Sequence, residues 1–215
     1  MEVADHYLSQ RLALTDLYAG LGTAELQQQV PGCPEWQVKD VLAHLVGLPE
    51  CVASGDMADA GQPSWTQRQV ERGRDRSVEE LLGQWSEAAP EFEESLAGLG
   101  FRGWVFTYDV TMHGDDVREA LELPLGTSPT HAVVLDGIIE RARSRATDLG
   151  TLTLRAGDRT WTLGEGEPAA TLTVADEGQL GRVIGARRSD AAVLALDWTG
   201  DPTPWIPVLP LFRDR

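Results

Sequence analysis

The spacing of the hydrophobic residues changes near residue 150, and this change constrains the fold of the 215-residue chain more than any other feature. Before that point, apolar side chains recur every three or four positions, as they do on amphipathic helices. After it they alternate in twos between Gly and Asp turns, which is typical of short antiparallel strands. We therefore predict an α+β protein with a helical domain at 1–150 and a small α+β domain at 151–215.

Helical spacing marks several segments of the first domain. The expected helices are 3–21, 35–49, 77–96, 103–123 and 130–148. Ser77 and Glu80 have the spacing of a capping box, which supports a helix start there. The polar stretch 53–76 is expected to be a loop with a short helix around 65–72. In the second domain we expect strands at 151–155, 160–163 and 170–174, and helices at 177–186 and 190–196.

Charge and composition restrict the partners. The net charge of −16 would repel a phosphate backbone, so nucleic acid is not expected as a partner. No apolar stretch approaches the roughly 20 residues that span a bilayer, and the first residues lack a basic, apolar leader. We expect a cytoplasmic protein without a membrane partner, and both a monomer and a homodimer remain open. Cys33 and Cys51 are expected to be small buried or half-exposed thiols.

Two expected helices carry residues that suit a metal ion. His44 lies on the second of them, and Asp109 and His113 lie four positions apart on the fourth, so both can face the same side. A single histidine on an apolar face is more often a core residue with satisfied hydrogen bonds. Burying His113 beside Asp109 and Asp116 without a cation or hydrogen-bond donors, however, would cost on the order of several kcal/mol. We therefore predict that His44, Asp109 and His113 bind one divalent ion and leave a position open.

Four further residues are candidates for supporting roles. Asp116, one turn beyond His113, would hold the second ring nitrogen of that histidine, and an exposed helix acid or a packing cap is the alternative. Arg72 and Arg74 lie in the expected loop and would bind a substrate carboxylate, with a solvated basic face as the alternative. Trp36 is expected to be a packing residue that anchors the second helix.

These motifs resemble a known family. Trp36, Asp40 and His44 followed by Leu, together with His113, Asp116 and the Val-Arg-x-Ala-Leu that follows, are similar to the mycothiol-dependent maleylpyruvate isomerase family within the DinB-like bundles. The resemblance covers about the first 125 residues, and the C-terminal segment is similar to the small α+β domain of many members. It implies a DinB-like up-down four-helix bundle with metal ligands at His44, Asp109 and His113, and zinc as the ion, with nickel as the alternative. The family usually has Glu or His at the position of Asp109, whose side chain is one carbon shorter than Glu.

The resemblance also implies an activity. The expected protein is a metal-dependent enzyme that uses mycothiol as a thiol cosubstrate on a small electrophilic or unsaturated acid, as an isomerase or as an S-transferase. Mycothiol is the thiol of actinobacteria, and the 17 Arg against one Lys agree with such a high-GC source. The alternative is a non-catalytic DinB-like binding or interaction module with a decayed metal site.

Overall fold

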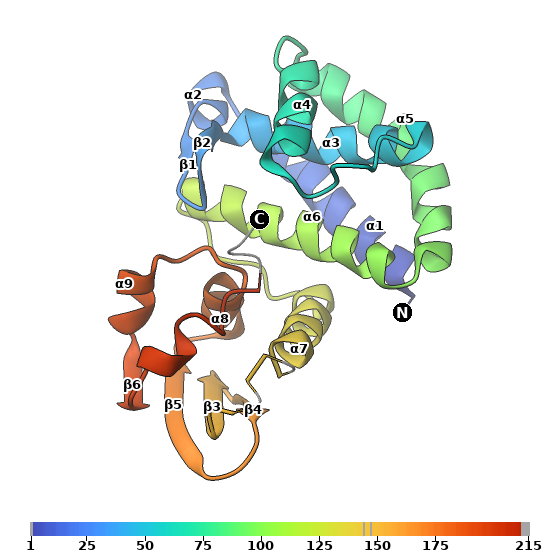
Figure 1. The fold of residues 1–215 in the computed structure, drawn as a ribbon. Coiled ribbons are helices and arrows are strands. Elements are labelled where there is room, and N and C mark those ends of the chain that lie inside the picture. The colour runs from blue at the N-terminus through green and yellow to red at the C-terminus, as the bar shows by residue number, and fades with distance from the viewer. Residues whose placement is uncertain (1, 144, 147, 212–215) are drawn as a thin grey trace. The chain divides into compact units, whose positions relative to one another are not determined.

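The computed structural model of the protein describes residues 2–143, 145–146 and 148–211. The chain divides by its internal contacts into two compact units, one up to Leu125 and one from Gly126 onward (Figure 1). The predicted boundary near residue 150 lies further along the chain. The division falls earlier because α7 (Pro129–Arg143) packs against α8 (Glu177–Ile184) and β4 (Arg159–Gly164) of the second unit.

Four long helices build the first unit, and they confirm the helical part of the predicted α+β class. They are α1 (Val3–Ala19), α3 (Val38–Ser54), α5 (Val78–Leu96) and α6 (Phe101–Ala120). Both α1 and α3 pack against α5 and against α6, so the apolar sides of the four helices share one core (Figure 1). Tyr7, Leu42, Trp85 and Val110 are fully buried in it. No helix among the described residues has the length and apolar character that crossing a bilayer requires.

The prediction that the second helix begins at residue 35 was wrong. The helix begins at Val38, and Cys33–Gln37 form strand β2, which pairs with β1 (Gln29–Val30); the short α2 (Thr23–Leu26) precedes this ribbon. The Gln29 amide holds the ribbon by donating to the Pro34 and Trp36 carbonyl oxygens at 2.5 and 2.9 Å. The Asp40 carboxylate then accepts the Gln37 N–H at 2.9 Å, which caps the helix one turn later than the apolar pattern suggested.

The same helix also ends later than predicted. It runs through Pro49 to Ser54 and ends at Gly55, whose φ of +74° suits glycine. The missing N–H of Pro49 removes one helical hydrogen bond, yet Leu48 and Cys51 on either side of it are buried and keep the helix in the core. The short helix expected around residues 65–72 is confirmed as α4 (Pro63–Gly73).

The predicted capping box at the start of α5 is confirmed. The Glu80 N–H donates to the Ser77 hydroxyl at 3.1 Å, and the Ser77 N–H donates to the Glu80 carboxylate at 2.6 Å. The helix continues to Leu96, and η1 (Ala97–Leu99) leads into α6. Gly100, with a φ of +56°, makes the turn between them.

The second unit holds a four-stranded sheet in the order β4-β3-β5-β6. Its other strands are β3 (Thr151–Ala156), β5 (Pro168–Val174) and β6 (Asp197–Gly200), with α9 (Asp190–Leu194) and η2 (Thr203–Trp205) between and after them. The three predicted strands are confirmed, but the purely antiparallel sheet is not. Strand β3 pairs with β5 in parallel, and β6 was missed. Alternation of apolar residues locates a strand but does not identify its neighbours.

The helix predicted at 130–148 corresponds to α7, although positions 144 and 147 lie outside the described residues. On this helix, Asp136 accepts hydrogen bonds from the Arg159 guanidinium at 2.6 Å and from the Trp161 indole at 2.7 Å. Arg159 also reaches Glu177 at 2.8 Å. These contacts join α7, β4 and α8 within the second unit.

Candidate metal site

The structure brings the three predicted metal ligands together. His44 lies on α3, and Asp109 and His113 lie on the neighbouring α6. The His44 Nε2 atom is 3.1 Å from one Asp109 oxygen, and the His113 Nε2 atom is 3.7 Å from the other. One donor atom of each residue lies within 4.8 Å of the other two. Because zinc holds nitrogen and oxygen at about 2.0–2.2 Å, donors of one ion lie roughly 3–3.5 Å apart, so small shifts would complete the site.

A buried glutamine that the sequence analysis missed orients His44. Gln69 lies on α4 and is only 1% exposed. Its amide oxygen is 2.6 Å from the His44 Nδ1 atom, and its amide nitrogen donates to the Cys51 sulfur at 3.3 Å. Since the glutamine oxygen can only accept, this arrangement assigns the His44 proton to Nδ1 and leaves a lone pair on Nε2.

That lone pair provides a test of whether the site fits a cation. The His44 Nε2 atom faces the Asp109 carboxylate at 3.1 Å, so two acceptors meet there in neutral His44. Two acceptors repel each other unless a proton or a cation lies between them. With a second imidazole nitrogen beside the same carboxylate, the donor set is one that binds divalent zinc or nickel.

Two glycines let α4 approach α3 closely enough to place Gln69. A Cβ atom at Gly47 would lie 2.8 Å from the Gln69 Cβ atom, and one at Gly73 would lie 2.6 Å from the Ala43 Cβ atom. Both distances are too short for real side chains. The sequence does contain a signal for Gln69, because its spacing of four from Trp65 and from Gly73 places the three residues on one side of a helix. The structure buries all three.

Asp116 lies beside the other nitrogen of His113. Its carboxylate is 2.9 Å from His113 Nδ1, although the direction of the ring N–H does not satisfy hydrogen-bond geometry. Asp116 is fully buried, which excludes the alternative of an exposed helix acid. The Cys33 thiol donates to the same carboxylate at 3.7 Å. Burial, and then the nearby Asp116 carboxylate, raise the pKa of Tyr18 well above its ordinary value.

Trp36 packs against both candidate histidines. Its ring centroid is 5.2 Å from that of His44 and 5.7 Å from that of His113, and the two imidazoles are themselves 4.9 Å apart. Trp36 is therefore a packing residue, as predicted, and the side chains that it packs against are the two candidate histidine ligands. Strand β2, rather than the predicted helix, carries this side chain to the rings.

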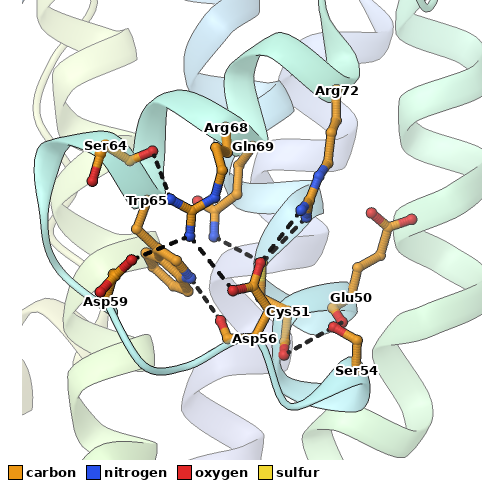
Figure 2. A network of polar contacts seen from close by, with 10 residues as sticks. All are labelled: Glu50, Cys51, Ser54, Asp56, Asp59, Ser64, Trp65, Arg68, Gln69 and Arg72. Carbon is orange, nitrogen blue, oxygen red and sulfur yellow. Dashed lines mark hydrogen bonds and ion pairs between the residues drawn. The ribbon is translucent and has the colours of Figure 1, made fainter.

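The two arginines proposed for substrate binding lie in different surroundings. Arg72 pairs with Asp56 at 3.3 Å and approaches the Cys51 sulfur at 3.8 Å, as Figure 2 shows. Its side chain is 47% exposed, so part of it is accessible to solvent. Arg74 follows α4 and lines a pocket of about 600 Å³ together with Lys39 and Asp40. Substrate binding by either arginine stays a prediction.

Around Arg72, a network of polar contacts links the end of α3 to α4 (Figure 2). Arg68 approaches Asp56 at 3.5 Å and Asp59 at 3.9 Å, and the Trp65 indole donates to the Asp56 carbonyl oxygen at 2.7 Å. The segment between these helices is a loop, as predicted, and it is held by ion pairs and by an indole hydrogen bond.

Comparison with known proteins places the chain in a family. Residues 8–126, more than half of the 215, match the mycothiol maleylpyruvate isomerase N-terminal domain. Among solved structures, the crystal structure of the mycothiol-dependent maleylpyruvate isomerase is similar in fold, with a TM-score of 0.54 at 11% identity over 87% of this chain and 89% of that chain. The crystal structure of a mutant of that isomerase gives a TM-score of 0.50 with the same identity and coverage. No curated protein matches the sequence. The chain thus belongs to the mycothiol maleylpyruvate isomerase N-terminal domain family.

Proposed function

We propose that the protein is a metal-dependent enzyme that uses mycothiol as its thiol cosubstrate. The observation that carries the proposal is the meeting of His44 and His113 at the Asp109 carboxylate, with the lone pair of His44 turned toward it by Gln69. Membership of the family supports the choice of thiol, since the solved relative is named a mycothiol-dependent isomerase. Zinc is the proposed ion, and nickel is the alternative for the same donors.

The residues of the site have separate tasks in this proposal. His44, Asp109 and His113 would hold the ion, which supplies the positive charge that deprotonates a bound thiol at neutral pH. Gln69 keeps the His44 proton on Nδ1, away from the ion. Trp36 covers both imidazole rings and limits the access of water to them. The Asp109 side chain is 28% exposed, so the ligands meet near the surface, where small molecules can reach them.

The substrate class in the proposal is a small electrophilic or unsaturated acid. In an isomerase, the thiolate sulfur forms a bond to one carbon of a cis double bond, the former double bond rotates, and the new carbon–sulfur bond breaks again. In an S-transferase, the new carbon–sulfur bond remains in the product. The solvent-facing side of Arg72 is proposed to pair with the substrate carboxylate, and Arg74 is the second candidate. A cytoplasmic location, where small thiols are kept reduced, belongs to the same proposal.

Metal content of the purified protein tests the proposal. The full chain, prepared without a chelating tag, is analysed by mass spectrometry as wild type, His44→Ala and His131→Ala. His131 lies on α7 beside Ser128 and controls for the loss of a histidine outside the site. The expected result is about one zinc or nickel fewer per chain in His44→Ala than in the wild type and in His131→Ala.

The loaded protein is then screened with mycothiol and unsaturated acids, with His44→Ala as the inactive control. If the wild type binds no metal even when zinc is supplied, the enzyme proposal is overturned. The non-catalytic binding module then becomes the better description.

A further inference from the structure

A second cluster of metal-ligating atoms lies on the opposite side of the His113 ring. The Cys33 sulfur, the His113 Nδ1 atom and an Asp116 carboxylate oxygen all lie within 4.8 Å of one another. We propose that these three residues form a second cation site, which selects a thiophilic ion such as zinc. The proposal goes beyond the mycothiol chemistry proposed above and does not require an ion at His44.

The fold brings the three residues together from two elements. His113 and Asp116 lie three positions apart on α6 and therefore face the same side. Cys33 begins β2 and pairs with Val30 of β1, and β1 packs against α6. The ribbon that replaces the predicted start of the second helix is thus the element that carries the thiol to the site.

The buried Asp116 carboxylate and the buried His113 ring favour the binding of a cation at this site. Asp116 is fully buried and His113 is 5% exposed, so both are shielded from water. Among the described residues the His113 Nδ1 atom makes no hydrogen bond, even though the Asp116 oxygen is only 2.9 Å away. An ion bonded to both atoms would satisfy the nitrogen and neutralise the carboxylate at once. Cys33 is half-buried, which leaves a path from solvent.

The distances suit one tetrahedral ion. The sulfur–oxygen and nitrogen–oxygen distances are 3.7 and 2.9 Å. With zinc bonds of about 2.0–2.2 Å to nitrogen and oxygen and about 2.3 Å to sulfur, such pairs lie roughly 3–3.6 Å apart. The thiolate favours zinc, cobalt or cadmium over magnesium or calcium, which prefer oxygen ligands.

Binding at this site displaces protons in a definite way. The thiol proton leaves with the formation of the sulfur–metal bond, and the imidazole proton moves from Nδ1 to Nε2 of His113. The Nε2 proton would then face Asp109, the carboxylate of the first site. If both sites are filled, this proton also leaves and His113 bonds to one ion through each nitrogen.

Cobalt is the probe for the test, because a cobalt–thiolate bond has a charge-transfer band in the near ultraviolet that nitrogen and oxygen ligands do not produce. The full chain, free of added thiol and oxygen, is titrated with cobalt as wild type, Cys33→Ser, Cys51→Ser and His44→Ala. We expect the band in all of them except Cys33→Ser. Cys51 is the matched control, being the other cysteine of the chain. Circular dichroism checks that each variant is folded.

The outcomes separate this proposal from the proposed function. A thiolate band that survives in His44→Ala supports the second site even if the first binds nothing, since the first site contains no sulfur. Cobalt binding without the band in the wild type, or a band that persists in folded Cys33→Ser, overturns the second site. An Asp116→Asn variant provides an independent check, and an unchanged cobalt affinity in it would also overturn the assignment.

Discussion

The candidate site contains two imidazole rings. Each ring has one nitrogen toward Asp109 and the other toward a different partner. For His44 that partner is the Gln69 amide at 2.6 Å, and for His113 it is the Asp116 carboxylate at 2.9 Å. A hydrogen-bonded partner such as Gln69 fixes the tautomer and orientation of a metal-binding histidine, so its loss should lower metal affinity. The Asp116 carboxylate lies beside His113 Nδ1 without a hydrogen bond, so Gln69 is the partner to test first.

Replacing Gln69 with leucine should weaken zinc binding about 10–100-fold, because His44 would lose the acceptor that holds its proton on Nδ1. The measurement is competition with a chromophoric chelator at constant pH. Gln67→Leu is the control, since its amide pairs with Glu71 at 3.2 Å on the same helix and does not contact His44. Equal zinc affinity in Gln69→Leu and wild type would contradict the assigned role.

The length and charge of residue 109 can be separated by two substitutions. Asp109→Asn removes the negative charge between the two Nε2 atoms, so zinc retention should fall at least about tenfold. Asp109→Glu keeps the charge and adds one carbon, so it should retain zinc in the same competition assay. Loss of zinc in both variants would show that the site depends on the shorter side chain, and retention in both would remove Asp109 from the ligand set.

The contact between α3 and α4 positions Gln69, and its closeness depends on glycine. At Gly47 the neighbouring Gln69 side chain leaves no room for a Cβ atom. Closely packed helices have to move apart to make room for an added Cβ atom. The loss of stability from this movement exceeds the gain from the higher helix propensity of alanine. The effect on the helix contact should therefore be visible in both stability and metal binding.

Gly47→Ala should lower the free energy of unfolding by about 1–3 kcal/mol and weaken zinc binding, because Gln69 is pushed from His44. Gly83→Ala on α5 is the matched control, since a Cβ atom there meets nothing within 4 Å. That variant should be neutral or gain up to about 1 kcal/mol from helix propensity. Urea unfolding of the two variants gives the comparison, and a Gly47→Ala protein as stable as Gly83→Ala would refute the close approach.

The start of α5 should make stability depend on pH in the acid range. The backbone N–H of Ser77, and then its side chain, lower the pKa of Glu80 below its ordinary value of 4.5. Since the folded pKa is the lower one, this contribution is fully present above pH 4.5 and disappears as the pH falls through the folded value. Thermal unfolding midpoints between neutral and acid pH should therefore fall less steeply for Glu80→Gln than for wild type. Glu79→Gln, which leaves the capping box intact, should behave as wild type.

The whole chain contains two compact units, and only the first contains the candidate metal ligands. The candidate metal residues all lie before Leu125, whereas the contacts of Asp136 with Arg159 and Trp161 lie within the second unit. A ligand that binds one folded unit stabilises that unit by mass action, by about 2.7 kcal/mol at a hundred times its dissociation constant. The two units should therefore respond to different changes.

Calorimetry of the full chain should show two unfolding transitions, and zinc should raise the midpoint of only one of them. Asp136→Asn should lower the midpoint of the other by an amount equivalent to at most about 1 kcal/mol, because this ion pair is half exposed. A single transition that moves as a whole with zinc would contradict independent unfolding of the units.

Local patterns in the sequence were enough to predict the long helices and three of the four strands of the C-terminal sheet, and to select His44, Asp109 and His113 as candidate ligands that the fold brings together. Apolar periodicity and the Ser77 capping box depend on residues within one or two turns, so they can be read along the chain. The His113 and Asp109 spacing is local in the same sense, and the match with His44 required only the expectation that two helices pack together.

Other features were decided by contacts between residues distant in the sequence. The parallel pairing of β3 with β5 depends on which strand edges meet, and the strand at Cys33–Gln37 depends on its pairing with β1. Gln69 reaches His44 only because Gly47 and Gly73 let α4 lie against α3, and Cys33 reaches Asp116 only through the β1–β2 ribbon. Periodicity shows which face of an element is buried but not which element covers it, so the residues that orient the two histidines became visible only in the tertiary structure.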